Sequence, residues 1–287
     1  MSGELSRVLV MGGTGMLGHV AVGVLAEGAE VVASVRDPET ARRYDLPAQL
    51  VAFDAAQDDV RALLQRVRPD AVLNAIGLVK QLPAGQSPRT AIRINSLFPH
   101  ELAEASAQIG ARLIHVSTDC VFSGELPAPR RYTEDDVPDA RDVYGRSKLL
   151  GEILEPPGLT LRTSIIGHEL QRSSGLLEWV AGSDGETRSG FRRAHFSGFT
   201  TLELSRIIRR VLAQHPDLSG LWHVAAAPID KYDLLLRLCD VLGVQAEIVP
   251  RDEPVINRAL DPSRFEQATG YRPPSWDQML EEYRSHE

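Results

Sequence analysis

The first half of the chain alternates short apolar runs with longer segments in which apolar residues recur at helical spacing. Residues 7–12 predict a strand, and residues 16–28 predict a helix that ends at Gly28. Further strands are predicted at residues 30–35, 50–54, 71–77 and 112–117, and further helices at residues 57–67 and 89–110. Strands that alternate with helices build βαβ units. The pattern therefore predicts the α/β fold class, with a Rossmann-like, doubly wound parallel sheet.

The pattern changes after residue 117. A loop rich in proline and charge covers residues 124–142, and residues 168–193 are interpreted as loop, short helix and polar turn. Thr200 stands three residues before Glu203, a capping-box pattern that opens an apolar-periodic helix. Residues 258–283 contain two short helical patterns separated by RPPS. We expect a main domain at residues 1–167 and a smaller lobe at residues 168–287, interleaved with the first.

Composition narrows the class of protein. The chain has 287 residues, 43% of them hydrophobic, which is enough apolar material for one large core. The net charge of −8 argues against a nucleic-acid partner but leaves room for a local phosphate pocket. No apolar stretch is long enough for a membrane span, and the chain does not start with a signal-peptide pattern. Cys120 and Cys239 lack metal-ligand spacing. We expect a cytoplasmic, metal-independent protein with no membrane partner.

The turn after the first predicted strand is rich in glycine. Gly12, Gly15 and Gly18 fit G-x-x-G-x-x-G, and Gly13 offers an overlapping G-x-G-x-x-G. A plain turn between a strand and a helix also uses glycine. Here the glycines follow a strand and open a helix, which is the setting that lets a pyrophosphate approach the helix N-terminus. We therefore predict a dinucleotide site that includes Gly12, Gly15, Met16, Leu17 and Gly18.

The end of the second predicted strand bears on the identity of the dinucleotide. An acidic residue there binds a ribose hydroxyl of NAD(H), whereas a basic residue accommodates the 2′-phosphate of NADP(H). In this sequence the expected acid position is apolar, and Arg36 follows it, then Asp37. Arg36 favours NADP(H), and Asp37 leaves NAD(H) open. Asp54 could bond the adenine amine or cap the next helix.

Tyr144 and Lys148 are four residues apart in a predicted helix, so both lie on one helical face. By spacing alone, the tyrosine could simply pack and the lysine be solvated. However, Thr118 and Asp119 follow a buried strand at its carboxyl end, the edge where open α/β sheets bind ligands. A hydroxyl there, followed by Tyr-x-x-x-Lys, indicates a catalytic group.

These motifs resemble the extended short-chain dehydrogenase/reductase family, and in particular the dTDP-4-dehydrorhamnose reductases and related sugar-nucleotide reductases. The resemblance rests on GGTGMLG, VLNAIG, STDCVFSG, YGRSKLLGE and LRTSIIG in family order, and it extends into the second lobe. It implies a catalytic trio of Thr118, Tyr144 and Lys148. It also implies a Rossmann cofactor domain at residues 1–167, a substrate lobe at residues 168–287 and a nucleotide-sugar substrate, and it allows a homodimer. Further cofactor contacts are expected from Asn74, Ala75, Gly77, Tyr144 and Lys148.

The chemistry of a ketone reduction explains the pair. Hydride goes to carbon, and Tyr144 would give a proton to oxygen while Thr118 shares the developing charge. An ammonium about 4 Å from the phenol contributes about 4 kcal/mol at an effective dielectric constant of about 20. We therefore expect Lys148 to lower the pKa of Tyr144 by about 3 units before desolvation opposes it.

Other residues carry weaker expectations. Lys80, Asp119 and Arg258 are candidate substrate contacts. A solvated loop explains Lys80 equally well, and a salt bridge is favoured over a substrate contact for Arg258. Gln81 shares the loop of Lys80. Asn95 is expected to hold backbone beside the site, and His115 to be packed. Cys120 stands where many members of the family carry an aromatic residue.

Three functions remain open at this point. The first is an NADPH-dependent reductase of a nucleotide-linked 4-keto-6-deoxy sugar. The second is an epimerase or dehydratase with the same site; dehydratases of this branch usually carry Asp-Glu after the threonine, and this chain has Asp119 and Cys120. The third is a non-catalytic NADP-binding regulatory subunit, since the methionine adenosyltransferase regulatory subunit resembles the same family.

Overall fold

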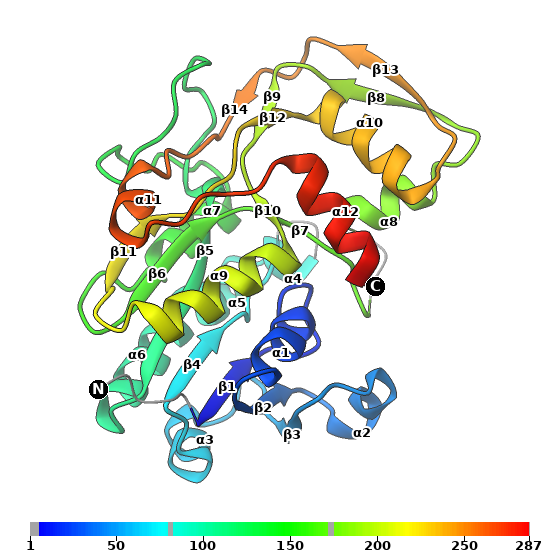
Figure 1. Ribbon diagram of the computed structural model, residues 1–287. Helices are drawn as coiled ribbons and strands as arrows, with labels where there is room; N and C mark the ends of the chain where they lie inside the picture. The colour runs from blue at the N-terminus through cyan, green and yellow to red at the C-terminus, as the bar shows by residue number, and fades with distance from the viewer. Residues whose placement is uncertain (1–5, 80–82, 172–174, 287) are drawn as a thin grey trace.

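A seven-stranded parallel sheet forms the centre of the protein (Figure 1), as seen in a computed structural model that describes residues 6–79, 83–171 and 175–286. The strand order is β11-β6-β5-β4-β1-β2-β3, and every neighbouring pair is parallel. The strands are β1 (Arg7–Met11), β2 (Glu30–Val35), β3 (Gln49–Ala52), β4 (Ala71–Asn74), β5 (Arg112–Thr118), β6 (Leu159–Thr163) and β11 (Gly220–His223). This confirms the predicted Rossmann-like α/β fold, and the strand order reverses next to β1 in the way that creates a ligand crevice.

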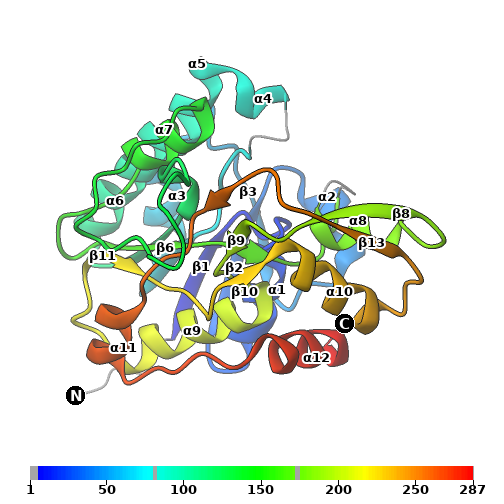
Figure 2. The same ribbon diagram turned by 90° about the horizontal axis from the view of Figure 1, so that it is seen from above.

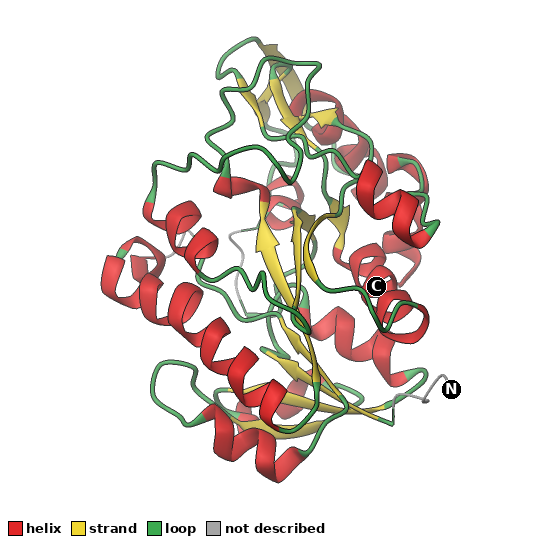
Figure 3. Cartoon of the chain, turned by 90° about the vertical axis from the view of Figure 1, so that its left-hand side faces the viewer, coloured by secondary structure: helices red, strands yellow, loops and turns green. Residues whose placement is uncertain are grey.

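Helices cover both faces of the sheet (Figures 2 and 3). One face carries α1 (Gly18–Ala26) and α9 (Thr201–Gln214), which pack against each other. The other face carries α3 (Val60–Val67), α5 (Pro88–Ala91), η2 (Ile92–Leu97), α6 (Phe98–Gln108) and α7 (Val143–Leu150). The segments α5, η2 and α6 run on directly from one another, with η2 as a π-helical stretch, and they correspond to the single helix predicted at residues 89–110. The remaining short segments of this domain are α2 (Pro38–Ala41), η1 (Arg42–Tyr44), α4 (Pro83–Gln86) and η3 (Asp119–Val121).

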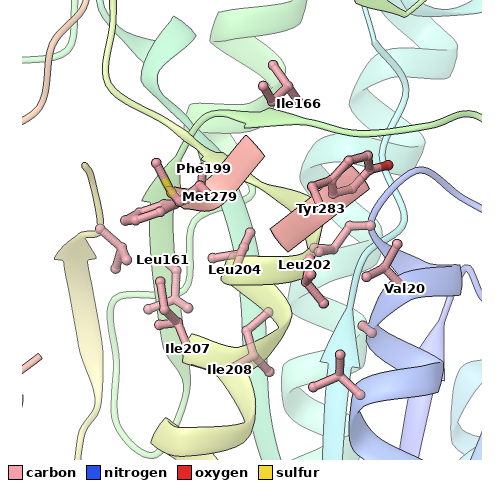
Figure 4. Packing of buried hydrophobic residues seen from close by; sticks show 14 of the residues in the cluster. Val20, Leu161, Ile166, Phe199, Leu202, Leu204, Ile207, Ile208, Met279 and Tyr283 are labelled. Carbon is pink, nitrogen blue, oxygen red and sulfur yellow. The ribbon is translucent and has the colours of Figure 1, made fainter. Parts of the chain in front are cut away.

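The larger hydrophobic core lies between the sheet and the α1–α9 face (Figure 4). Val20 of α1, Leu161 of β6 and the apolar stripe of α9 meet there. Each fully buried aliphatic or aromatic side chain of this kind contributes about 1.5–3 kcal/mol through burial. Helix α9 begins as predicted, because Thr200 accepts a hydrogen bond from the backbone N–H of Glu203 at 3.2 Å. The Glu203 carboxylate binds the Tyr271 hydroxyl instead of completing the capping box.

Small sheets and helices make up the rest of the structure, and those around α10 lie at the top of Figure 1. These remaining elements are β7 (Ile165–Ile166), α8 (Leu176–Ala181), β8 (Thr187–Phe191), β9 (Ala194–Phe196), β10 (Phe199–Thr200), β12 (Ile229–Asp230), α10 (Lys231–Leu242), β13 (Glu247–Arg251), β14 (Ile256–Asn257), α11 (Ser263–Thr269) and α12 (Trp276–His286).

Two predictions for this half of the chain had different outcomes. The two helices predicted within residues 258–283 are confirmed as α11 and α12. The polar turn predicted before residue 193 is wrong, because residues 187–191 form strand β8, which pairs with β13. The sequence of β8 shows no alternation of apolar and polar residues, because much of this strand is in contact with solvent in its two-stranded sheet. The division at residues 167 and 168 stays a prediction; β11, from the second part, pairs with β6 in the central sheet.

Two further findings concern the described residues as a whole. Within residues 6–79, 83–171 and 175–286, no helix combines the length and apolarity needed to cross a membrane. The same residues contain no cluster of three or more His, Cys, Asp or Glu side chains that could hold a metal ion.

Candidate active site

The glycine turn connects β1 to α1 through a close backbone approach. Gly12 has a φ of +87°, a conformation that side chains disfavour. A Cβ on Gly18 would lie 2.0 Å from the carbonyl oxygen of Gly12, so only glycine lets the helix start this close to the turn. Ser34 of β2 holds the turn, since its hydroxyl accepts a hydrogen bond from the Gly12 N–H at 3.1 Å. The glycines therefore let the first turn of α1 lie directly against the turn that follows β1.

A pocket of about 230 Å³ opens beside this turn, at the carboxyl ends of β1, β2 and β4. It is lined by Gly12, Thr14, Gly15, Met16, Ser34, Val35, Arg36, Phe53, Asp54, Ala55, Ala75, Ile76, Gly77, Leu78, Ile94, Glu169, Leu170 and Gln171. Most of the predicted cofactor residues are therefore brought together. The side chain of Leu17, by contrast, is buried in the hydrophobic core with Val20.

The charged residues around the pocket have different roles. Arg36 lines it, whereas Asp37 caps α2 by accepting hydrogen bonds from the backbone of Glu39 and Thr40. Asp54 also lines the pocket and accepts a bond from the Ala56 N–H at 2.9 Å. The cap of α3 is Asp59, so the helix-capping alternative for Asp54 is wrong.

The wall formed by the segment after β4 is tied to helix α7. Asn95 accepts a bond from the Leu78 N–H at 2.8 Å and donates to the Leu78 carbonyl at 3.0 Å and to the Ser147 hydroxyl at 3.1 Å. Asn95 is fully buried, and it holds backbone beside the site as expected. Asn74 has both ends of its amide engaged internally, with the Ile76 N–H and with His115.

Strand β5 delivers the threonine and the aspartate. Thr118 accepts a hydrogen bond from the Cys120 N–H at 3.1 Å, which starts the tight turn η3. Asp119 is buried, and burial raises its pKa against the opposing attraction of Arg258. Arg258 itself donates to the carbonyl oxygens of Phe122 and Ser123 at 2.8 and 3.0 Å. Arg258 therefore supports the backbone of this turn and attracts the Asp119 carboxyl.

Helix α7 packs closely against the turn η3, and a glycine permits this contact. Asp142 caps its N-terminus by accepting from the Gly145 N–H at 2.7 Å. A Cβ on Gly145 would lie 2.2 Å from the carbonyl oxygen of Cys120, so the glycine permits the contact that places Tyr144 beside β5. Thr118 lies close enough to the Tyr144 phenol to lower its pKa. The predicted threonine and tyrosine are thus adjacent.

The electrostatic expectation for this pair is wrong. Burial raises the pKa of Tyr144, a neighbouring Cys120 adds to the rise, and the hydrogen bond from Thr118 offsets only part of it. Lys148 does not lower it, because its nitrogen donates to the Val116 carbonyl at 2.8 Å and lies 3.3 Å from Nε2 of His115. Burial also lowers the pKa of Lys148 to about 8, despite the attraction of Glu152. At neutral pH the phenol keeps its proton, which is the form that can act as an acid.

Three residues of the site have contacts that the sequence did not predict, and two predicted residues lie where the structure gives no description. Lys80 and Gln81 lie outside the described residues. His115 was expected only to pack, yet its ring contacts Lys148. Ser34 and Gly145 were not assigned roles. For Gly145, its position directly after Tyr144 was the available signal, since a glycine in a helix usually marks close packing.

The fold is that of a Rossmann-like α/β protein, with a pocket at the carboxyl ends of β1, β2 and β4. Thr118 on β5 and Tyr144 and Lys148 on α7 do not line this pocket. A model of the family called RmlD substrate binding domain matches residues 6–166, which is more than half of the chain. The chain belongs to this family.

Proteins with a similar sequence include proteins named as reductases and one named as a subunit of methionine adenosyltransferase. The dTDP-4-dehydrorhamnose reductase of Mycobacterium tuberculosis is 34% identical over 271 residues, covering 90% of this chain and 74% of that protein. Methionine adenosyltransferase 2 subunit beta of Xenopus tropicalis is 27% identical over 291 residues, covering 93% and 84%. The crystal structure of the dTDP-4-dehydrorhamnose reductase of Bacillus anthracis in complex with NADP superposes with a TM-score of 0.78 at 22% identity, covering 98% and 99%. The last likeness shows that the fold is shared.

Proposed function

We propose that this protein is an NADPH-dependent reductase of a nucleotide-linked 4-keto-6-deoxy sugar. The observation that carries the proposal is the close packing of Gly145 on the Cys120 carbonyl, which brings Tyr144 of α7 to Thr118 at the carboxyl end of β5. The name of the relative in Mycobacterium tuberculosis supports the reaction and the substrate class. The NADP complex of the Bacillus anthracis protein supports a cofactor of this type.

The residues around the pocket fit a dinucleotide. Gly12 and Gly18 bring the turn after β1 and the N-terminus of α1 into direct contact, and a helix N-terminus at this place suits a pyrophosphate. Arg36 would pair with the 2′-phosphate of the adenosine ribose, and the engagement of Asp37 in capping α2 favours this assignment over a ribose hydroxyl contact. Asp54 would face the adenine. We also propose that residues 168–287 act as the substrate lobe.

The reaction divides between cofactor and protein. When bound, NADPH supplies the hydride that goes to the carbonyl carbon. Tyr144 donates its phenolic proton to the carbonyl oxygen as that oxygen gains negative charge. The Thr118 hydroxyl orients the same oxygen and shares its charge. Burial keeps the Tyr144 phenol protonated at neutral pH, so the group is present in the form that can donate a proton to the substrate oxygen.

The test is NADPH oxidation, followed by absorbance, with a panel of dTDP-4-keto-6-deoxy sugars. Tyr144→Phe should bind NADPH like the wild type and lose turnover by about 100-fold or more, the contribution typical of a general acid. Tyr132→Phe is the matched control, since its ring also lies near the site, stacked on Phe122, while its hydroxyl bonds the Leu126 N–H. It should keep turnover near the wild-type rate. Equal rates in wild type and Tyr144→Phe would remove Tyr144 from the mechanism.

A regulatory subunit is the second candidate, favoured by the similarity to methionine adenosyltransferase 2 subunit beta. It predicts tight NADPH binding without reduction of any sugar on a panel extended to other nucleotides. In that case the partner would be sought by copurification, and the Tyr144→Phe protein would bind it as well as the wild type does.

A further inference from the structure

Three buried polar side chains form a continuous chain behind the proposed active site. Asn74 ends β4, His115 lies in β5 as its register partner, and Lys148 belongs to α7. Nδ2 of Asn74 lies 3.0 Å from Nδ1 of His115, and Nε2 of His115 lies 3.3 Å from Nζ of Lys148. The first two residues are 0% exposed and the lysine 4%. Buried polar groups of this kind are costly unless they are paired, so the direction of each hydrogen bond has consequences.

The backbone sets that direction. The Ile76 N–H donates to Oδ1 of Asn74 at 3.1 Å, so the oxygen end of the amide faces Ile76 and the NH₂ end faces His115. An amide NH₂ can only donate, so Nδ1 of His115 must accept. A neutral imidazole with an accepting Nδ1 carries its hydrogen on Nε2. The ring is neutral, because burial and then the charge of Lys148 hold the pKa of His115 well below its ordinary value.

The N–H of the ring therefore faces the nitrogen of Lys148. An ammonium offers only donors and cannot accept this hydrogen, whereas a neutral amine accepts it and still donates to the Val116 carbonyl. We propose that Asn74 and His115 are positioning residues that present an N–H to Lys148 and so set how readily the lysine takes up its proton. The inference rests on the proposed function only in giving Lys148 a use in catalysis.

The other charged and titratable groups around Lys148 act in known directions. Glu152, after the end of α7, attracts the ammonium. Its carboxylate is shared with Arg162 of β6, at 2.7 Å, and with the hydroxyl of Ser117, at 2.6 Å. Tyr144 on the same helix keeps its proton and is neutral. His100 of α6 acts on His115 by lowering its pKa. Glu152 is paired with Arg162, and the Val116 carbonyl accepts from an amine and an ammonium alike, whereas the His115 N–H can be accepted only by the amine.

The direct test is the tautomer of His115 in protein labelled with ¹⁵N-histidine. The chain has 8 histidines, and loss of one signal in His115→Gln assigns the ring. The wild type should show the Nε2–H tautomer, with a shift that changes near pH 8 as Lys148 titrates and that stays flat in Lys148→Met. An Nδ1–H tautomer in the wild type would overturn the inference. This measurement needs neither cofactor nor substrate.

Asn74→Asp should reverse the direction of the hydrogen bond between His115 and Lys148. Aspartate keeps an acceptor for the Ile76 N–H but cannot donate to His115, so the ring should move its hydrogen to Nδ1 and turn an accepting Nε2 toward Lys148. The ammonium gains an acceptor and a nearby negative charge, so the transition should move to higher pH by about 1–3 units. The matched control is Asn95→Asp, which makes the same change at an equally buried asparagine bonded to Leu78 and Ser147.

The control should leave both the tautomer and the transition near pH 8 in place. A transition that stays unmoved in Asn74→Asp, or that moves as far in Asn95→Asp, contradicts the inference. The pH dependence of sugar reduction should also move to higher pH in Asn74→Asp and stay in place in Asn95→Asp. If no sugar is reduced while the spectra behave as expected, the proposed function fails and the inference about Lys148 stands.

Discussion

Replacing Gly18 with alanine tests the close approach on which the dinucleotide site depends. The added Cβ would lie 2.0 Å from the Gly12 carbonyl oxygen, and real Cβ contacts are not found below 3.0 Å. The start of α1 must therefore move by about 1 Å away from the turn. Overpacking of this kind costs about 1–3 kcal/mol. We expect the free energy of unfolding to fall by that amount, and NADPH affinity to fall by about tenfold, which corresponds to about 1.4 kcal/mol.

Gly23→Ala is the matched control for Gly18→Ala. It makes the same change in the same helix, where a Cβ would meet no atom within 4 Å. Alanine is the better helix former, so this variant should gain about 0.5–1 kcal/mol and bind NADPH like the wild type. Urea unfolding gives the stabilities, and the quenching or enhancement of NADPH fluorescence gives the affinities. Gly18→Ala with wild-type stability and affinity would refute the argument that glycine is required at this contact.

Two further predictions concern charge. Arg36→Ala should weaken NADPH about 10- to 100-fold, as expected for a lost charge-assisted contact, and NADH much less; Arg42→Ala, which removes a nearby surface arginine paired with Glu39, should affect both equally. Equal losses of both cofactors in Arg36→Ala would contradict the 2′-phosphate assignment. At pH 7 the charged form of Lys148 destabilises the fold by about 3 kcal/mol, since its pKa falls from 10.5 to about 8. Lys148→Met should raise the free energy of unfolding by less than this, because it leaves the Val116 carbonyl and the His115 ring without a partner. Between pH 8 and 10.5 the unfolded chain binds the extra proton, so wild-type stability should rise with pH and the advantage of methionine should shrink; a constant difference in urea unfolding across this range would contradict the assignment.

Much of the fold was predictable from local patterns. The apolar runs of β1, β2, β4 and β5 and the amphipathic helices between them appear as strands and helices at the predicted places. This succeeded because strands of a central parallel sheet are buried on both faces and so read as continuous apolar segments. The peripheral strand β8 was missed, since a half-exposed strand with arginine and serine has no such signature.

The residues of the candidate site could be predicted, because each of them belongs to a motif that spans only a few residues of the sequence. The glycine turn, Arg36, Thr118 and the Tyr144–Lys148 pair were all found in this way. What each side chain does to the others depends on strand register and helix packing, which place Asn74 beside His115 and Gly145 against Cys120.

The sequence by itself determined the class of fold and the residues that meet at the edge of the sheet, because hydrophobic periodicity and motif spacing act over a few residues. Only the tertiary structure decided the electrostatics of that edge. Burial raises the pKa of Tyr144, and Lys148 turns to His115 and the Val116 carbonyl. The physical reason is that desolvation and hydrogen-bond direction depend on neighbours from β4, β5 and α7, which are distant in the chain and meet only when it folds.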